Sequence, residues 1–126
     1  MRSNTRRALA LAAAEQGYEI EISIQEHDQV EIELIAADWE DENESRYVAR
    51  RLQAHRLANG RWINAQWSHQ HGQWQSRDIT RRTARYNTNT CYVFSRNLHP
   101  LAGNCYTYRT AGQAILSVIR DLGAGA

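Results

Sequence analysis

The sequence contains no lysine, and proline, methionine and phenylalanine occur once each. Cysteine occurs twice, at Cys91 and Cys105, without the C-x-x-C spacing of zinc ribbons and redox motifs. We therefore expect two free thiols in a cytoplasmic protein, because disulfides are rare in that compartment. No apolar run approaches the roughly 20 residues that a helix needs to cross a bilayer, so the sequence predicts no membrane association.

The motifs of several common enzyme classes are also missing. Neither a G-x-G-x-x-G fingerprint nor a P-loop occurs, and a G-x-S-x-G elbow and an H-E-x-x-H zinc motif are absent as well. His69 and His71 form an H-x-H pair, but no acidic or thiol residue follows at the spacing of a metal site. We expect no cofactor, no metal and no catalytic residue. An enzyme whose site no motif reveals stays an alternative.

The N-terminus combines a basic segment, residues 1–7, with an apolar one, residues 8–14, and so resembles a secretory signal peptide. The apolar segment is short and mostly alanine, and a helix that ends before Gly17 fits it better. With 42% apolar residues among 126, the chain is long enough to bury a core. We expect one domain over residues 1–126.

Residues 18–25 and 29–36 alternate apolar and polar side chains with a period of two. Such alternation is typical of a half-buried antiparallel hairpin, which would turn at residues 26–28. Four carboxylates would then share the face opposite the aliphatic side chains: Glu19, Glu21, Glu31 and Glu33.

The rest of the sequence predicts further helices and hairpins. These are a helix at residues 44–58, a hairpin at 61–81 around residues 71–72, strands at 91–95 and 105–108 separated by a turn at 97–104, and a final helix that begins with a T-x-x-Q capping box at residue 110. Residues 76–86 fit either a strand or a basic helix. The sequence thus predicts an α+β fold, a largely antiparallel sheet built from hairpins with helices packed on it, in the order α-β-β-α-β-β-β-β-α.

Charge is divided sharply along the chain, although the net charge is only +1. Residues 15–44 hold twelve acidic side chains and no arginine, whereas residues 46–109 hold eleven arginines and one acid. Arginine binds phosphate and carboxylate in forked pairs more readily than lysine does. A GC-rich genome, such as that of some bacteria and their phages, also encodes arginine in place of lysine for mutational reasons alone.

The acidic hairpin suggests a binding role. Like charges across a strand pair destabilise it by tenths of a kcal/mol, so the four glutamates need water, the chain's own arginines or a partner. We predict a small non-enzymatic binding protein of the inhibitor or adaptor type. Its acidic hairpin face would dock on a basic surface of a partner protein, for example one that normally holds nucleic acid.

The arginine-rich half supports an alternative, a nucleic-acid-binding module. Interleaved cations and aromatic rings bind single strands through phosphate contacts and base stacking. The residues that would form such a face are Trp62, Arg77, Arg81, Arg82 and Arg85, while Trp67 and Trp74 are expected in the core. A homodimer that joins the acidic face of one copy to the basic face of another is a further possibility.

Overall fold

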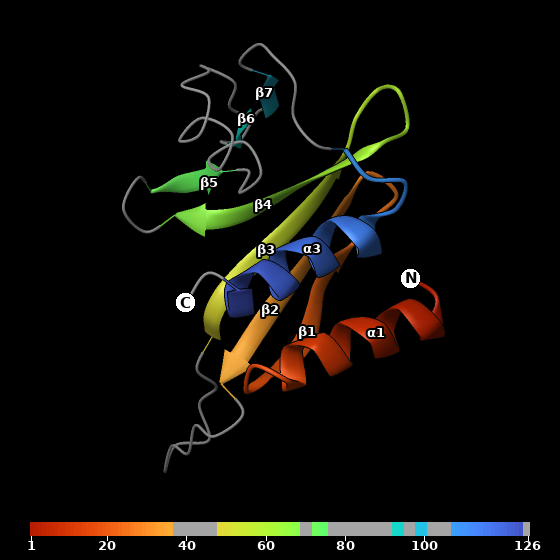
Figure 1. Ribbon diagram of the computed structural model, residues 1–126. Coiled ribbons are helices and arrows are strands. Elements are labelled where there is room, and N and C mark those ends of the chain that lie inside the picture. Colours follow the sequence, from red (N-terminus) through yellow and green to blue (C-terminus); the bar gives the residue numbers. More distant parts are fainter. Residues whose placement is uncertain (37–47, 69–71, 76–91, 95–97, 101–106, 125–126) are drawn as a thin grey trace.

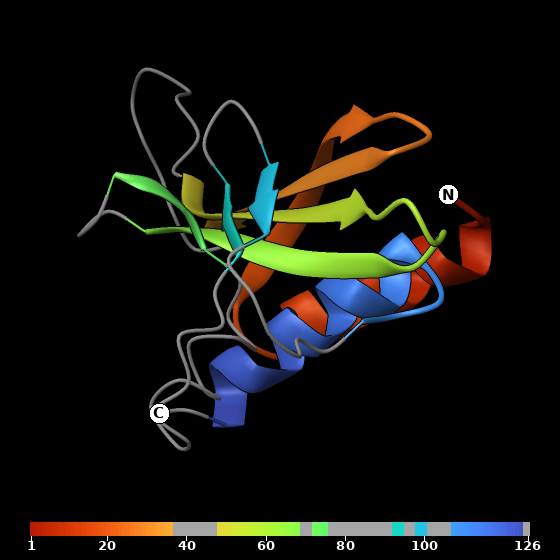
Figure 2. The same cartoon turned by 90° about the horizontal axis from the view of Figure 1, so that it is seen from above.

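Two helices cover one face of an antiparallel β-sheet in this chain (Figure 1, Figure 2). The structure, a computed structural model, describes residues 1–36, 48–68, 72–75, 92–94, 98–100 and 107–124. Four longer strands form the main part of the sheet, and three short ones continue it in sequence order. The predicted α+β class and antiparallel sheet are confirmed. Within the described ranges, no helix is long and apolar enough to cross a membrane.

The first hairpin is formed by β1 (Tyr18–Gln25) and β2 (Gln29–Ala36), as predicted. Ile22 pairs with Ile32, and both pack in the core beneath the helices together with Ile20, Val30 and Leu34. A bulge after Ile22 leaves Ser23 without a partner in the register. The bulge bends the ladder locally and sets the direction of the Ser23 side chain.

Strand β3 (Val48–Arg56) lies where the sequence predicted a helix over residues 44–58, so that prediction is wrong. Val48 and Leu52 have helical spacing, but Leu52 and Ala54, two residues apart, are both fully buried on one face. β3 also pairs with β2 on one side and with the next strand on the other. Ladder hydrogen bonds on two sides outweigh local helix propensity, which differs by only tenths of a kcal/mol per residue.

A second hairpin joins β4 (Trp62–Ser68) to β5 (Gln73–Gln75), with Trp67 paired to Trp74. The hairpin predicted at residues 61–81 is matched over the described residues 62–68 and 73–75, whereas residues 69–71 and 76–81 lie outside the described ranges. The order over the described residues is therefore α-β-β-β-β-β-β-β-α, which differs from the predicted order at β3.

The sheet ends with β6 (Tyr92–Phe94) and β7 (Leu98–Pro100). A strand was predicted near β6, but β7 falls in a stretch predicted as a turn, and that prediction is corrected. Pro100 ends the outermost strand, where a missing N–H disturbs pairing least. Residues 76–86, which fitted either a strand or a helix, lie outside the described residues.

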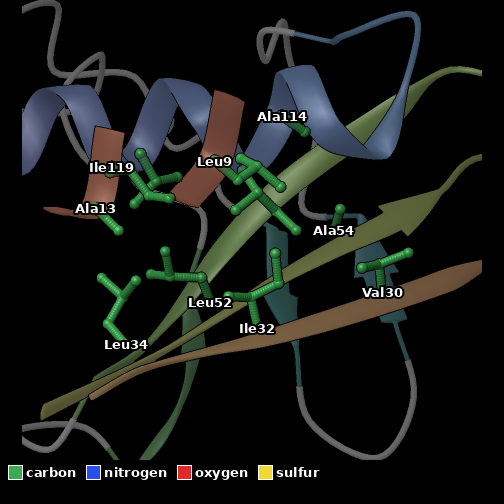
Figure 3. Close-up of a cluster of buried hydrophobic side chains, with 11 residues drawn as sticks. Leu9, Ala13, Val30, Ile32, Leu34, Leu52, Ala54, Ala114 and Ile119 are labelled. Carbon is green, nitrogen blue, oxygen red and sulfur yellow. The ribbon is translucent and has the colours of Figure 1, made fainter. Parts of the chain in front are cut away.

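Helices α1 (Ser3–Ala14) and α3 (Ala111–Ala124) pack together over β1 to β4 (Figure 2). The Thr110 hydroxyl accepts a hydrogen bond from the Gln113 N–H at 3.2 Å, so the predicted N-terminal cap of α3 is present. Between helices and sheet lies the main core (Figure 3). Its largest members are Leu9, Ile32, Leu34, Leu52, Ile115 and Ile119. Each such side chain contributes about 1.5–3 kcal/mol on burial.

The two helices approach most closely at their N-terminal ends. A Cβ atom added to Gly112 would overlap the Cγ2 methyl of Thr5. At the other end, the Gln16 side chain donates a hydrogen bond to the Ile119 carbonyl. The Gly112–Thr5 contact therefore requires glycine because of space, not because of an unusual backbone conformation.

We predict that Gly112→Ala lowers the unfolding free energy by about 1–3 kcal/mol, the usual cost of overpacking. In an open helix the same change stabilises, because alanine has the higher helix propensity. Adding Thr5→Ala should restore most of the loss by removing the overlapping methyl. Urea unfolding of the two single variants and the double variant measures this, and strictly additive effects would contradict the contact.

Candidate functional site

Strand alternation sends a set of polar side chains to the sheet face opposite α1 and α3, here called the outer face. Cross-strand registers place them side by side. The set comprises Glu19, Glu21 and Ser23 of β1, Glu31 and Glu33 of β2, and Arg51, Gln53 and His55 of β3. Apolar side chains of the same three strands fill the core on the opposite face. The outer face therefore carries the polar side chains.

A hydrogen-bonded network joins three strands across this face. The Ser23 hydroxyl donates to Oε2 of Glu31 at 2.6 Å, and the Gln53 amide donates to Oε1 of the same carboxylate at 2.8 Å. Nε2 of His55 lies 2.6 Å from Oε1 of Gln53. Gln53 is only 5% exposed. Its amide therefore depends on these partners, since a buried polar group without hydrogen bonds is costly.

His55 is held in its neutral form. Burial lowers the pKa of its imidazole from 6.5 to about 4, and the nearby Asp28 and Glu31 carboxylates offset this only in part. Because Oε1 of Gln53 can only accept, the His55 Nε2 atom must carry the hydrogen. The network thus runs in one direction, from imidazole to amide to carboxylate.

This arrangement positions the Glu31 carboxylate. The Gln53 amide links the His55 imidazole to Glu31 through two hydrogen bonds. The Ser23 hydroxyl binds the carboxylate and not the imidazole. No group of three or more His, Cys, Asp or Glu side chains suited to a metal ion occurs in the part of the chain that is described. The network fixes Glu31 in place and ties β1, β2 and β3 together.

The four predicted carboxylates do share the outer face, but in two different environments. Glu19 and Glu21 are exposed on β1, whereas Glu31 and Glu33 are half-buried on β2. Glu21 and Glu33 stand directly opposite each other in the register. Glu31 is engaged in the network, so the accessible carboxylates are mainly those nearest to the sheet edge.

In the described ladders, an arginine stands opposite a member of this acidic set at one position. Arg51 stands opposite Glu33 in the β2–β3 register. No ion pair joins Glu19 or Glu33 to an arginine among the residues that the structure describes, where the pair shown is His27 with Asp28 at 3.9 Å. The chain's own described arginines therefore leave Glu19 and Glu33 unneutralised.

The predicted arginine–tryptophan face is placed only in part. Trp62, the expected stacking platform, is half-buried on the helix side, packs against the main core and pairs with Tyr108. Arg77, Arg81, Arg82 and Arg85 lie outside the described residues.

Two further tryptophans, from β4 and β5, form a pair on the outer face. Trp67 and Trp74 meet edge to face, with ring centroids 5.6 Å apart and an interplanar angle of 71°. Both are half-buried, and Trp74 also packs on the small cluster of Ile63 and Ala65. Trp67 and Trp74, which were predicted as core residues, are thus half-buried rather than fully buried.

Sequence reasoning missed the network because it assigned Gln53 and His55 to a helix. On a helix these residues cannot share a sheet face with Glu31. The signal that was present is the alternation Arg51, Gln53, His55 against Leu52 and Ala54, which is short but has the period of a strand.

Comparison of the chain with models of protein families, with curated proteins and with solved structures gives no match. The functional conclusions below therefore depend on the chain's own residues.

We predict that His55 makes stability depend on pH between 6.5 and 4. The unfolded imidazole takes up a proton near pH 6.5, but the folded one does so only near pH 4. Its contribution is complete above pH 6.5 and is lost as the pH falls toward 4, by up to about 3 kcal/mol. Urea unfolding of the wild type and of His55→Gln, which keeps a donor for Gln53, should differ in slope across this range.

His27→Gln is the matched control, because the His27 side chain is 80% exposed. It should keep the wild-type pH slope. An unchanged slope in His55→Gln would show that the buried imidazole does not govern acid stability.

Proposed function

We propose that this protein is a small non-enzymatic binding protein, of the inhibitor or adaptor type, working in the cytoplasm. The acidic outer face of the β1–β2 hairpin would dock on a basic surface of a partner protein. A protein surface that normally holds nucleic acid is the kind of partner that fits, because it presents clustered cations.

The observation that carries this proposal is the unneutralised state of Glu19 and Glu33. They lie on the same face of adjacent strands, and no described arginine forms an ion pair with either. Glu19 is exposed, and Glu21 beside it is exposed as well. Complementary charge accelerates encounter and selects the partner.

The hydrogen-bonded hairpin beneath Glu19 and Glu33 supports the same conclusion. The network that anchors Glu31 keeps the strands rigid beneath these carboxylates, so little order would be lost on docking.

A protective role is the main competing explanation for the exposed glutamates. β1 is the first strand of the sheet order and hence an edge strand. Charged side chains on an edge strand oppose edge-to-edge aggregation. The two explanations differ in outcome, because protection predicts aggregation of neutralised variants without any change in binding.

We predict that Glu19→Gln combined with Glu33→Gln weakens binding to a defined arginine-rich peptide by about tenfold, equal to about 1.4 kcal/mol. The salt dependence of binding should fall as well, because two charge contacts are removed. Calorimetric titration at several salt concentrations measures both quantities, and light scattering records aggregation in parallel.

The matched control is Glu15→Gln combined with Glu26→Gln, which removes the same charge from exposed positions at the end of α1 and at the hairpin turn. This pair should bind like the wild type. If both double variants lose the same affinity for the peptide, the effect depends only on net charge. Binding of a labelled oligonucleotide in place of the peptide would favour the nucleic-acid alternative, and a concentration-dependent dimer that the Glu19 and Glu33 changes dissolve would identify a second copy as the partner.

A further inference from the structure

The ladder between β3 and β4 covers only part of each strand. Their shared ladder runs from Arg56 paired with Trp62 to Leu52 paired with Gln66. Beyond that point β3 is paired only with β2 among the described strands, whereas Trp67 of β4 is paired with β5. The yellow β3 and green β4 diverge accordingly in Figure 1. The sheet therefore contains a fork with two walls.

The fork encloses a cavity of about 230 Å³. It is lined by Val48, Ala49, Arg50 and Arg51 of β3 and by Gln66 and Trp67 of β4. Because neighbouring residues of a strand point to opposite faces, Arg50 and Gln66 contribute on the helix side and Arg51 and Trp67 on the outer face. One wall supplies two cations, and the other supplies an amide and an indole ring.

These groups can together bind a ligand that carries both an anion and a flat ring. The guanidinium groups of Arg50 and Arg51 bind phosphate or carboxylate in forked pairs. Oε1 of Gln66 is buried and has no hydrogen-bond partner among the described residues, which is uncommon for a buried acceptor. The Trp67 ring is half-buried and held by its edge-to-face contact with Trp74, so it offers a fixed flat surface.

We propose that the β3–β4 fork binds a nucleoside monophosphate. The phosphate lies on the β3 wall against Arg50 and Arg51. On the β4 wall, an N–H group of the base donates to Oε1 of Gln66 and the ring packs on Trp67. Phosphate alone would leave the amide and the indole unused, and a neutral nucleoside would leave both cations unused. This site borders the acidic face at Arg51, which stands opposite Glu33 in the β2–β3 register, but it does not depend on the docking proposal.

Calorimetric titration of the full chain with adenosine monophosphate, adenosine and inorganic phosphate tests the assignment. The nucleotide should bind at least about tenfold more tightly than either fragment, since each fragment loses contacts to one wall. Arg50→Gln combined with Arg51→Gln should weaken nucleotide binding by at least about tenfold. Gln66→Met should weaken it too while raising the Tm of the free protein, because the unpartnered acceptor is removed.

The matched control is Arg6→Gln combined with Arg7→Gln, which removes two exposed cations from α1 and should leave binding unchanged. Thermal unfolding of every variant verifies that it is folded. The proposal is overturned if the monophosphates of adenosine, guanosine, cytidine and uridine all fail to bind. It is also overturned if phosphate binds as tightly as the nucleotide, or if the Arg50 and Arg51 changes have no larger effect than the control.

Discussion

Burial of Ile32, Leu34 and Leu52 beneath α1 and α3 decides which sheet face every other side chain occupies. A one-residue shift of β2 would expose Ile32 and Leu34 and turn its carboxylates into the core, and the same shift of β3 would expose Leu52. Since Leu→Ala changes at such sites cost about 2–5 kcal/mol, the register is strongly fixed. The polar outer face is thus a consequence of apolar packing on the other side.

The position of β3 between β2 and β4 explains why a polar network can exist there. Gln53 is nearly inaccessible to water, so it needs partners on the same face. The registers supply Glu31 from β2 and place Ile63 beside His55 from β4. Burial, with Ile63 as one neighbour, lowers the pKa of the imidazole and keeps it neutral, although the Asp28 and Glu31 carboxylates raise the pKa. The contact with the Gln53 amide is retained. A central strand can therefore carry polar residues on its outer face when neighbouring strands satisfy them.

How much of this could be read from the sequence depended on the length of each pattern. The first hairpin has eight-residue strands with regular alternation, and the last helix has a capping box, so both were predictable. β3 was not, because Val48 and Leu52 fit a helix and the alternation around Leu52 and Ala54 is short. The decisive interactions of β3 are ladders to β2 and β4, which are contacts between distant residues that no local window contains. The carboxylate face followed from local alternation, whereas the network required the β2–β3 register.

The strands lie in the sheet in sequence order, so charged residues that are far apart along these strands in the sequence also lie apart across the sheet. The acidic segment, residues 15–44, extends past the end of β2, and the arginine-rich segment begins just before β3. The β2–β3 ladder therefore joins an acidic strand to a basic one. Only Glu33 and Arg51 stand directly opposite each other across it among oppositely charged residues in that ladder. Among the described residues of that ladder, the acidic and basic sets thus meet at one cross-strand pair. Because the strands follow one another across the sheet, an exposed carboxylate, Glu19, lies on β1 while Arg50 and Arg51 line the fork on the other side of β2.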